Sequence, residues 1–276
     1  MSARLRAIAK ETEQIVDAGW YSAPGGGRVE IAAAVARAAA GTELFGPGPV
    51  ALPDGAAPAG PPRIEVTGES SLDAARRLTT AGRDPVAVLN FASARNPGGG
   101  FLNGAQAQEE ALCRSSALYA CLLRAPEFYA AHRADRDPFY SDRVIHSPAV
   151  PVFRDDRGTL LAAPYEVGFL TSAAPNAGVV ARRSPERTGE LPAVLHRRAE
   201  RVLRVASAAG YRRLVLGAWG CGVFRNDPAQ VAAAFRALLG PGGPFTGRVD
   251  EVVFGVLDRQ DPSPTRNAFA LEFASL

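Results

Sequence analysis

Short apolar runs alternate with longer amphipathic stretches along most of the chain. Residues 86–90 are almost continuously apolar, which is typical of a strand buried on both faces. Further strands are predicted over residues 64–67, 144–153, 167–172, 213–217 and 251–258. Within residues 144–153, Pro148 and Pro151 favour an edge strand or a bulge.

Helices are predicted between these strands. The first two cover residues 3–18 and 27–40, separated from the rest by a Pro- and Gly-rich connector over residues 46–62. Further helices are predicted over residues 109–121, 126–134 and 191–209. Ser70 or Ser71 can cap another helix that runs to about residue 80, and Asp227 can cap one that runs to residue 239. Strands that alternate with helices indicate a layered α/β domain.

Composition narrows the class of protein. The mean hydropathy is −0.03 and the net charge is +3, carried almost wholly by arginine, so a polyanionic ligand is compatible but not required. The first residues carry acids and lack an apolar core, so we expect no secretory signal. Three cysteines without paired spacing favour a reducing, cytoplasmic compartment, and three scattered histidines give no reason to expect a metal centre.

The most informative motif begins directly after the strand at residues 86–90. A glycine triplet, Gly98-Gly99-Gly100, is followed after a short spacer by Gln108-Glu109-Glu110. Glycine accepts positive φ and lets a ligand approach bare backbone, and the two carboxylates open a predicted helix. A loop of exposed backbone N–H groups next to a carboxyl group could bind a phosphate-bearing substrate or act on a glycosidic bond. First-turn helix capping would also favour adjacent glutamates, so that alternative stays open.

A second glycine-rich loop, GAWGCGVFRN at residues 217–226, lies between a predicted strand and the helix capped by Asp227. Such loops present backbone N–H groups to a diphosphate, and Gly220 and Gly222 permit a close approach. A dinucleotide-binding Gly-x-Gly-x-x-Gly would need glycine at Arg225 and would normally open the first βα unit. That departure argues against a nicotinamide dehydrogenase. A plain glycine-rich turn with a core aromatic is the simpler alternative.

The two glutamates cannot act as a conventional facing pair. Neighbours on a helix point about 100° apart, so we expect one to act on the glycosidic oxygen and the other to hold a ribose hydroxyl. A general acid needs a raised pKa, but the dipole at a helix N-terminus lowers the pKa of a carboxyl. Burial or a nearby diphosphate would therefore have to raise the pKa of the catalytic glutamate. Asn90 and Asn96, at the exit of the strand, could hold a ribose hydroxyl.

The stretch NPGGGFLNGAQAQEE together with GAWGCGVFRN resembles the compact bacterial poly(ADP-ribose) glycohydrolases, over roughly residues 60–260. The resemblance implies a macrodomain-like three-layer α/β/α domain with a mixed sheet over residues 61–276, preceded by an N-terminal helical extension over residues 1–60. It implies Glu110 as general acid and base and Glu109 as ribose holder. It also implies substrate contacts from Asn96, Gly98, Gly99, Gly100, Gln108, Gly220, Cys221, Gly222, Val223 and Phe224.

The implied activity is release of ADP-ribose from poly(ADP-ribose), mainly at chain ends, as part of the reversal of ADP-ribosylation in a bacterial DNA damage response. The implied partners are poly(ADP-ribose), ADP-ribose and ADP-ribosylated proteins. The resemblance also implies a monomer that needs no cofactor or metal and binds neither a membrane nor, as a requirement, nucleic acid. Two alternatives remain: a macrodomain that binds ADP-ribose without cleaving it, and a hydrolase for mono-ADP-ribosyl groups. The adenine-binding aromatic is not identified, with Phe153, Tyr165 and Phe169 in the region where it is expected. Residues near Thr265 are expected at the outer pocket.

Overall fold

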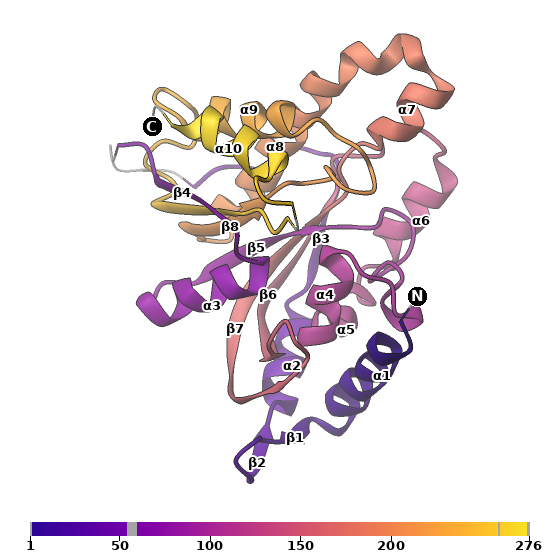
Figure 1. Cartoon of the computed structure of the whole chain (residues 1–276), viewed down its shortest axis with the longest axis vertical. Helices are drawn as coiled ribbons and strands as arrows, with labels where there is room; N and C mark the ends of the chain where they lie inside the picture. Colours follow the sequence, from indigo (N-terminus) through magenta and orange to yellow (C-terminus); the bar gives the residue numbers. More distant parts are fainter. Residues whose placement is uncertain (1, 54–59, 259, 275–276) are drawn as a thin grey trace.

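A seven-stranded mixed sheet forms the centre of the molecule (Figure 1). The structure, a computed structural model, describes residues 2–53, 60–258 and 260–274. The strand order is β3-β6-β7-β5-β8-β9-β4. The strands are β3 (Glu43–Phe45), β4 (Arg63–Thr67), β5 (Val86–Phe91), β6 (Val144–Arg154), β7 (Leu160–Ser172), β8 (Arg213–Gly217) and β9 (Glu251–Gly255). A separate hairpin pairs β1 (Trp20–Ser22) with β2 (Arg28–Glu30).

Helices cover both faces of the sheet (Figure 1). They are α1 (Ala3–Ala18), α2 (Ala32–Ala40), α3 (Ser71–Ala81), α4 (Gln108–Ser115), α5 (Leu118–Leu122), α6 (Pro126–Ala134), α7 (Ala177–Arg183), α8 (Leu191–Ala208), α9 (Pro228–Leu239) and α10 (Pro264–Phe273), with 3-10 turns η1 (Phe101–Asn103) and η2 (Pro185–Glu190). Val86 and Val88 of β5 pack with α1 to α6, whereas Ala87 and Leu89 pack with α8, α9 and α10. This division explains the continuous apolar run of β5 and confirms the expected α/β/α layering.

Parallel pairing brings the two glycine motifs to one edge of the sheet. β5 pairs in parallel with β7 and β8, and β8 pairs in parallel with β9. The glycine triplet follows β5, and the loop from Ala218 to Asn226 follows β8. Because the carboxyl ends of neighbouring parallel strands lie at the same edge, both loops face the same region.

Three sequence predictions need correction. Residues 28–30 form β2 rather than helix, because Gly26 and Gly27, at φ of 83° and 92°, turn the chain into a hairpin. The helix predicted over residues 109–121 stops at Ser116, whose hydroxyl donates to the Leu112 carbonyl at 2.7 Å and accepts from the Leu118 N–H at 3.2 Å. The last strand ends at Gly255 rather than residue 258.

The prolines of β6 mark a bulge in an interior strand. β6 lies between β3 and β7, and its register with β7 shifts between Ser147 and Val150. Ala149 lies in this shift with a φ of 46°. The bulge is therefore confirmed, and since β3 pairs only with residues 144–146, Pro148 and Pro151 lie on a part of β6 that β3 does not cover.

The N-terminal segment packs closely on the rest of the chain. Thr12 Oγ1 in α1 donates to the Arg114 carbonyl in α4 at 2.7 Å, and β3 joins the outer side of β6 in the central sheet. The division of the chain at residue 60 stays a prediction, and residues 54–59 of the predicted connector lie outside the described residues. Across the described ranges, we find no helix that is both long and apolar enough to cross a membrane.

Candidate active site

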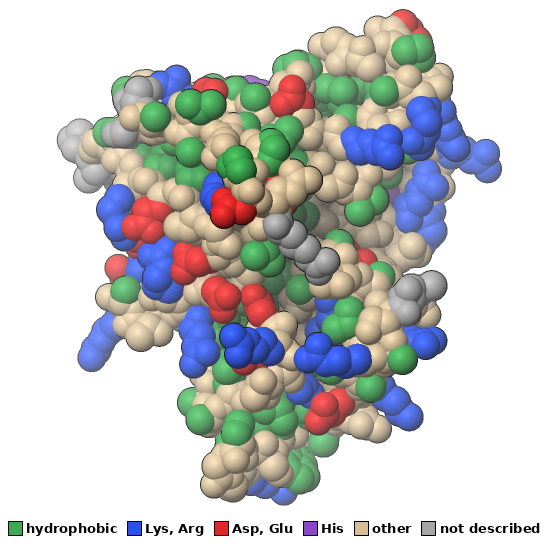
Figure 2. All heavy atoms as spheres, viewed as in Figure 1, with side chains coloured by type: hydrophobic (Ala, Val, Ile, Leu, Met, Phe, Trp, Pro, Cys, Tyr) green, Lys and Arg blue, Asp and Glu red, His purple; other side chains and the backbone are tan. Residues whose placement is uncertain are grey.

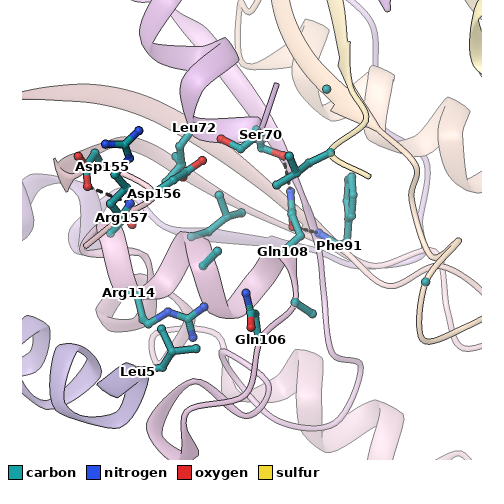
Figure 3. Close-up of a pocket in the computed structure, with 18 of the residues that line it drawn as sticks. Leu5, Ser70, Leu72, Phe91, Gln106, Gln108, Arg114, Asp155, Asp156 and Arg157 are labelled. Carbon is teal, nitrogen blue, oxygen red and sulfur yellow. Dashed lines mark hydrogen bonds between the residues drawn. The ribbon is translucent and has the colours of Figure 1, made fainter. Parts of the chain in front are cut away.

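A cavity of about 530 Å³ lies beside the two motifs (Figure 3), and neither the glycine triplet nor the two glutamates are among the residues that line it. The start of α4, with Gln108, forms one wall, and Cys221 and Gly222 of the second loop contribute to another. Other lining residues come from α1, the start of α3, the turn between β6 and β7, and the segment before α10. Sequence elements far apart in the chain therefore build one concave site.

Gln108 fixes the start of α4 to the end of β5. Its Nε2 donates to the Leu89 carbonyl at 2.8 Å and to Ser71 Oγ at 3.0 Å, and its Oε1 accepts from the Phe91 N–H at 2.9 Å. Figure 3 shows Gln108 directed toward Phe91 and the start of α3. Both amide protons are used inside the protein, so this side chain positions the glutamates that follow it.

Glu109 is the deeper of the two glutamates, with 2% of its surface exposed. Its Oε2 accepts from the Ser93 N–H at 2.7 Å, and its Oε1 accepts from Asn90 Nδ2 at 3.3 Å. Burial raises the pKa of Glu109 to about 8, against the opposing effect of these hydrogen bonds, and the neighbouring Glu110 raises it further.

Glu110 lies directly beneath the glycine triplet. Its Oε1 accepts from the Gly100 N–H at 2.9 Å, and 9% of the residue is exposed. A Cβ atom on Gly99 would stand 2.5 Å from Glu110 Oε1 and 3.2 Å from Glu109 Oε2. Gly99 also has a φ of 57°, so glycine is required there both by backbone conformation and by the two carboxylates.

The two candidate asparagines have different surroundings. Asn90 is fully buried beside Glu109, and within the described chain its Oδ1 has no hydrogen-bond partner. Asn96 is exposed, and its carbonyl accepts from the Gly99 N–H at 3.0 Å, which closes the turn into the triplet. Neither asparagine is among the residues that line the cavity. A ribose-binding role for Asn96 stays a prediction.

The second loop is held by the elements around it. Gly220 has a φ of 72°, and Asn226 Nδ2 donates to the Pro175 carbonyl at 2.8 Å. The Phe224 carbonyl accepts from the Gly178 N–H at the start of α7, at 2.9 Å. The Phe224 ring lies 5.8 Å from the ring of Tyr140. Val223 is 79% exposed, so this loop presents both backbone and side chains toward solvent at the site.

Several lining residues were not found from the sequence. Arg4 and Leu5 of α1 and the turn from Asp155 to Gly158 line the cavity, and Figure 3 shows Leu5 near the turn with Asp155, Asp156 and Arg157. The Asp-Gly content of that turn signals a hairpin, but nothing local indicates which cavity it borders. The first residues of α1 carried no recognisable signal.

The predicted outer residues can also be placed. Thr265 lines the cavity as expected, whereas Phe153 and Phe169 are fully buried in the core. Tyr165 donates its hydroxyl to the Leu72 carbonyl at 3.0 Å and is not a lining residue. Arg114 also lines the cavity, and its Nη1 donates to the Ala105 carbonyl at 2.6 Å. In the described part of the chain, no three His, Cys, Asp or Glu side chains cluster as a metal site requires.

The arrangement defines a class of protein. A mixed sheet between two helical layers, with two glycine-rich loops at the carboxyl ends of its strands, matches the macrodomain-like fold of the solved structures described next. Beneath the first loop, this protein also has two adjacent glutamates, and a carboxyl group of this kind is capable of proton transfer.

Comparison with known proteins identifies the family. The family model described as microbial-type PARG, catalytic domain, matches residues 9–155. The chain belongs to this family of microbial-type poly(ADP-ribose) glycohydrolases. A search of curated proteins gave no match.

Solved structures agree with this assignment over nearly the whole chain. A poly(ADP-ribose) glycohydrolase from Thermomonospora curvata is 55% identical, with a TM-score of 0.94 over 99% of this chain and 100% of its own. The structure of the T. curvata protein bound to the inhibitor ADP-HPD is 53% identical, with a TM-score of 0.90 over the same shares of the two chains. A glycohydrolase from Deinococcus radiodurans in complex with ADP-ribose is 46% identical, with a TM-score of 0.79 over 88% of this chain and 98% of its own.

Proposed function

We propose that this chain hydrolyses the ribose–ribose O-glycosidic bonds of poly(ADP-ribose), mainly at chain ends, and releases ADP-ribose. The family assignment supports the activity, as do the relatives whose structures hold ADP-ribose or an inhibitor. The observation that carries the proposal is the position of Glu110, whose carboxylate is fixed by the Gly100 N–H beneath the glycine triplet. ADP-ribosylated proteins would be the carriers of the polymer.

In the proposed reaction Glu110 acts on both halves of the cleavage. It donates a proton to the 2′-oxygen of the leaving ribose as the bond from that oxygen to the anomeric carbon breaks. It then accepts a proton from the water whose oxygen bonds to the anomeric carbon. Only Oε1 of Glu110 accepts a hydrogen bond from the described residues, so Oε2 is available for this exchange.

Glu109 would hold a ribose hydroxyl rather than transfer the proton. Both of its oxygens already accept hydrogen bonds, from Ser93 and Asn90, and the side chain is more deeply buried than Glu110. The backbone of residues 220–224 would hold the diphosphate, since glycines at 220 and 222 leave the backbone accessible. Substrate contacts from Gly98, Gly100, Gln108, Cys221, Val223 and Phe224 form part of the same proposal.

Two further parts of the proposal concern the whole protein. Cys113, Cys121 and Cys221 are all free thiols, which supports a reducing compartment such as the cytoplasm. The monomeric state remains a prediction, and gel filtration with light scattering measures it.

The test is Glu110→Gln, an isosteric change that retains an acceptor for the Gly100 N–H. We expect release of ADP-ribose from poly(ADP-ribose) to fall by about 10³-fold, within the usual range for loss of a general acid and base. Affinity for free ADP-ribose should stay within about threefold of wild type. Glu127→Gln is the matched control, because Glu127 is also a first-turn helix glutamate but is exposed in α6.

The outcomes separate the alternatives. A wild-type protein that binds ADP-ribose but cleaves no polymer would be a reader, and the proposal would fail. If Glu110→Gln still cleaves the polymer, the general acid must be a residue other than Glu110. Preference for mono-ADP-ribosylated protein over polymer would assign the chain to the other hydrolase class.

A further inference from the structure

Exposed arginines gather around the two glycine-rich loops. We define the basic surface as Arg95, Arg133, Arg182 and Arg225, all exposed and none in an ion pair with a described carboxylate. Figure 2 shows Lys and Arg side chains collected over the corner formed by α6 and α7, with few acidic groups between them. Elsewhere, arginines such as Arg77 and Arg212 have a carboxylate beside them.

The basic surface is joined to the glycine triplet through α6. Arg133 Nη1, in the last turn of α6, donates to the Arg95 carbonyl at 2.6 Å. Arg95 immediately precedes Asn96 and the turn into Gly98. The basic surface therefore borders the segment that leads into the glycine triplet.

The same surface is joined to the second loop through α7. The Gly178 N–H donates to the Phe224 carbonyl, and a Cβ on Gly178 would stand 3.1 Å from Arg225 Cδ. Arg182 lies four residues after Gly178, one turn further along the same face of α7. The nearby carboxylate of Asp137 already accepts from the Phe139 N–H and pairs with Arg187, so it does not neutralise these groups.

We propose that the basic surface binds the diphosphates of the polymer on the leaving side of the scissile bond. This inference rests on the proposed function. When a terminal ADP-ribose unit fills the site, its distal ribose reaches Glu110, and the rest of the polymer extends outward past the glycine triplet. Each further unit carries a diphosphate, and arginine forks suit phosphate oxygens. The surface thus distinguishes a long polymer from free ADP-ribose.

The experiment compares two double variants of the full chain. Arg133→Gln with Arg182→Gln removes two charges of the basic surface and touches no residue assigned to catalysis or to ADP-ribose. The control, Arg76→Gln with Arg83→Gln, removes two equally exposed and unpaired arginines on α3 and the turn before β5. KM for long poly(ADP-ribose) and Kd for free ADP-ribose are measured at about 0.05 and 0.3 M salt, a range over which screening changes strongly.

For the first double variant we expect KM for polymer to rise about 5- to 10-fold at low salt, with little change at high salt. The slope of log KM against log salt should fall by about 1.4, as for two lost contacts to a flexible single-stranded polyanion. Kd for ADP-ribose should equal that of wild type, and the control pair should match wild type throughout.

Four results would overturn the proposal. The first three are an unchanged KM for polymer in the first double variant, an equal rise in the control pair, and a parallel loss of ADP-ribose affinity. A surface that serves nucleic acid would lose affinity for single-stranded DNA while KM for polymer stayed at the wild-type value, which also overturns it. If wild type cleaves nothing, the proposed function fails, and polymer binding to the same variants by fluorescence anisotropy still tests the surface.

Discussion

Gly99→Ala should inactivate the protein while leaving it folded. The added Cβ would stand 2.5 Å from Glu110 Oε1, whereas ordinary van der Waals contact begins near 3.4 Å. The carboxylate must therefore retreat by about 1 Å, a shift of the size that costs about 10²-fold in rate when it misplaces a reacting group. The same shift takes the 2.9 Å hydrogen bond from the Gly100 N–H beyond the distance limit for such bonds.

Backbone strain adds a separate, smaller cost. Gly99 has a φ of 57°, a region that costs an L-residue about 1–2 kcal/mol. In a domain of this size that cost lowers the melting temperature by about 3–6 °C, which leaves the protein folded at assay temperature. The loss of kcat should therefore exceed what any loss of folded protein explains.

The assay measures kcat on poly(ADP-ribose) together with the melting temperature and Kd for ADP-ribose. Gly189→Ala is the matched control, because Gly189 lies in η2 with no atom within 4 Å of an added Cβ. We expect kcat to fall about 100-fold in Gly99→Ala and to stay unchanged in Gly189→Ala. A Gly99→Ala protein with wild-type kcat would show that Glu110 does not need its observed position, and the reasoning would be refuted.

Two further predictions concern Glu109 and Tyr140. Because the pKa of Glu109 is about 8 in the folded protein and 4.5 ordinarily, the folded state alone holds this proton between about pH 4.5 and 8, so stability falls as pH rises through that window. In Glu109→Gln, the decrease in the free energy of unfolding between pH 5 and pH 8, measured by urea unfolding, should be smaller than in wild type by about 2–4 kcal/mol. The same decrease in both proteins would contradict the prediction. Tyr140, held in a φ of 58° between the rings of His132 and Phe224, should position Phe224. Tyr140→Ala should raise KM about 3- to 10-fold with little change in kcat, Tyr140→Phe should match wild type, and a fall in kcat alone would argue against positioning.

The sheet and the two glycine-rich loops could be predicted from the sequence because each depends on a local pattern of residues. The apolar run of β5 requires burial on both faces, and parallel pairing with β8 then places the two loops at one edge. The break at Ser116 could not be predicted in the same way. Ser116 forms an isolated bridge with Val152, more than thirty residues away along the chain, and its extended conformation depends on that contact.

The walls of the cavity were the least predictable part of the site. Arg4 and the turn at Asp155 reach the cavity only because α1 packs beside α4 and the β6–β7 hairpin. Gln108 was predicted as a substrate contact from the motif alone. The structure assigns both of its amide protons to Leu89 and Ser71, a use that depends on the neighbouring strand and on the start of α3. Composition and spacing contain no information about such long-range partners.

The division of work proposed for the two glutamates runs in a direction that pKa alone would not suggest. Glu109 has the raised pKa expected of an acid, yet both its oxygens accept hydrogen bonds from Ser93 and Asn90 in a closed environment. Each oxygen accepts one hydrogen bond from these residues and can accept a second from a ribose hydroxyl, the role proposed for Glu109. Glu110 has one oxygen fixed by the Gly100 N–H, and it is the more exposed of the two. Burial, which raises the pKa of Glu109, opposes a second negative charge beside Glu110, so the proton exchange proposed for Glu110 would meet less repulsion.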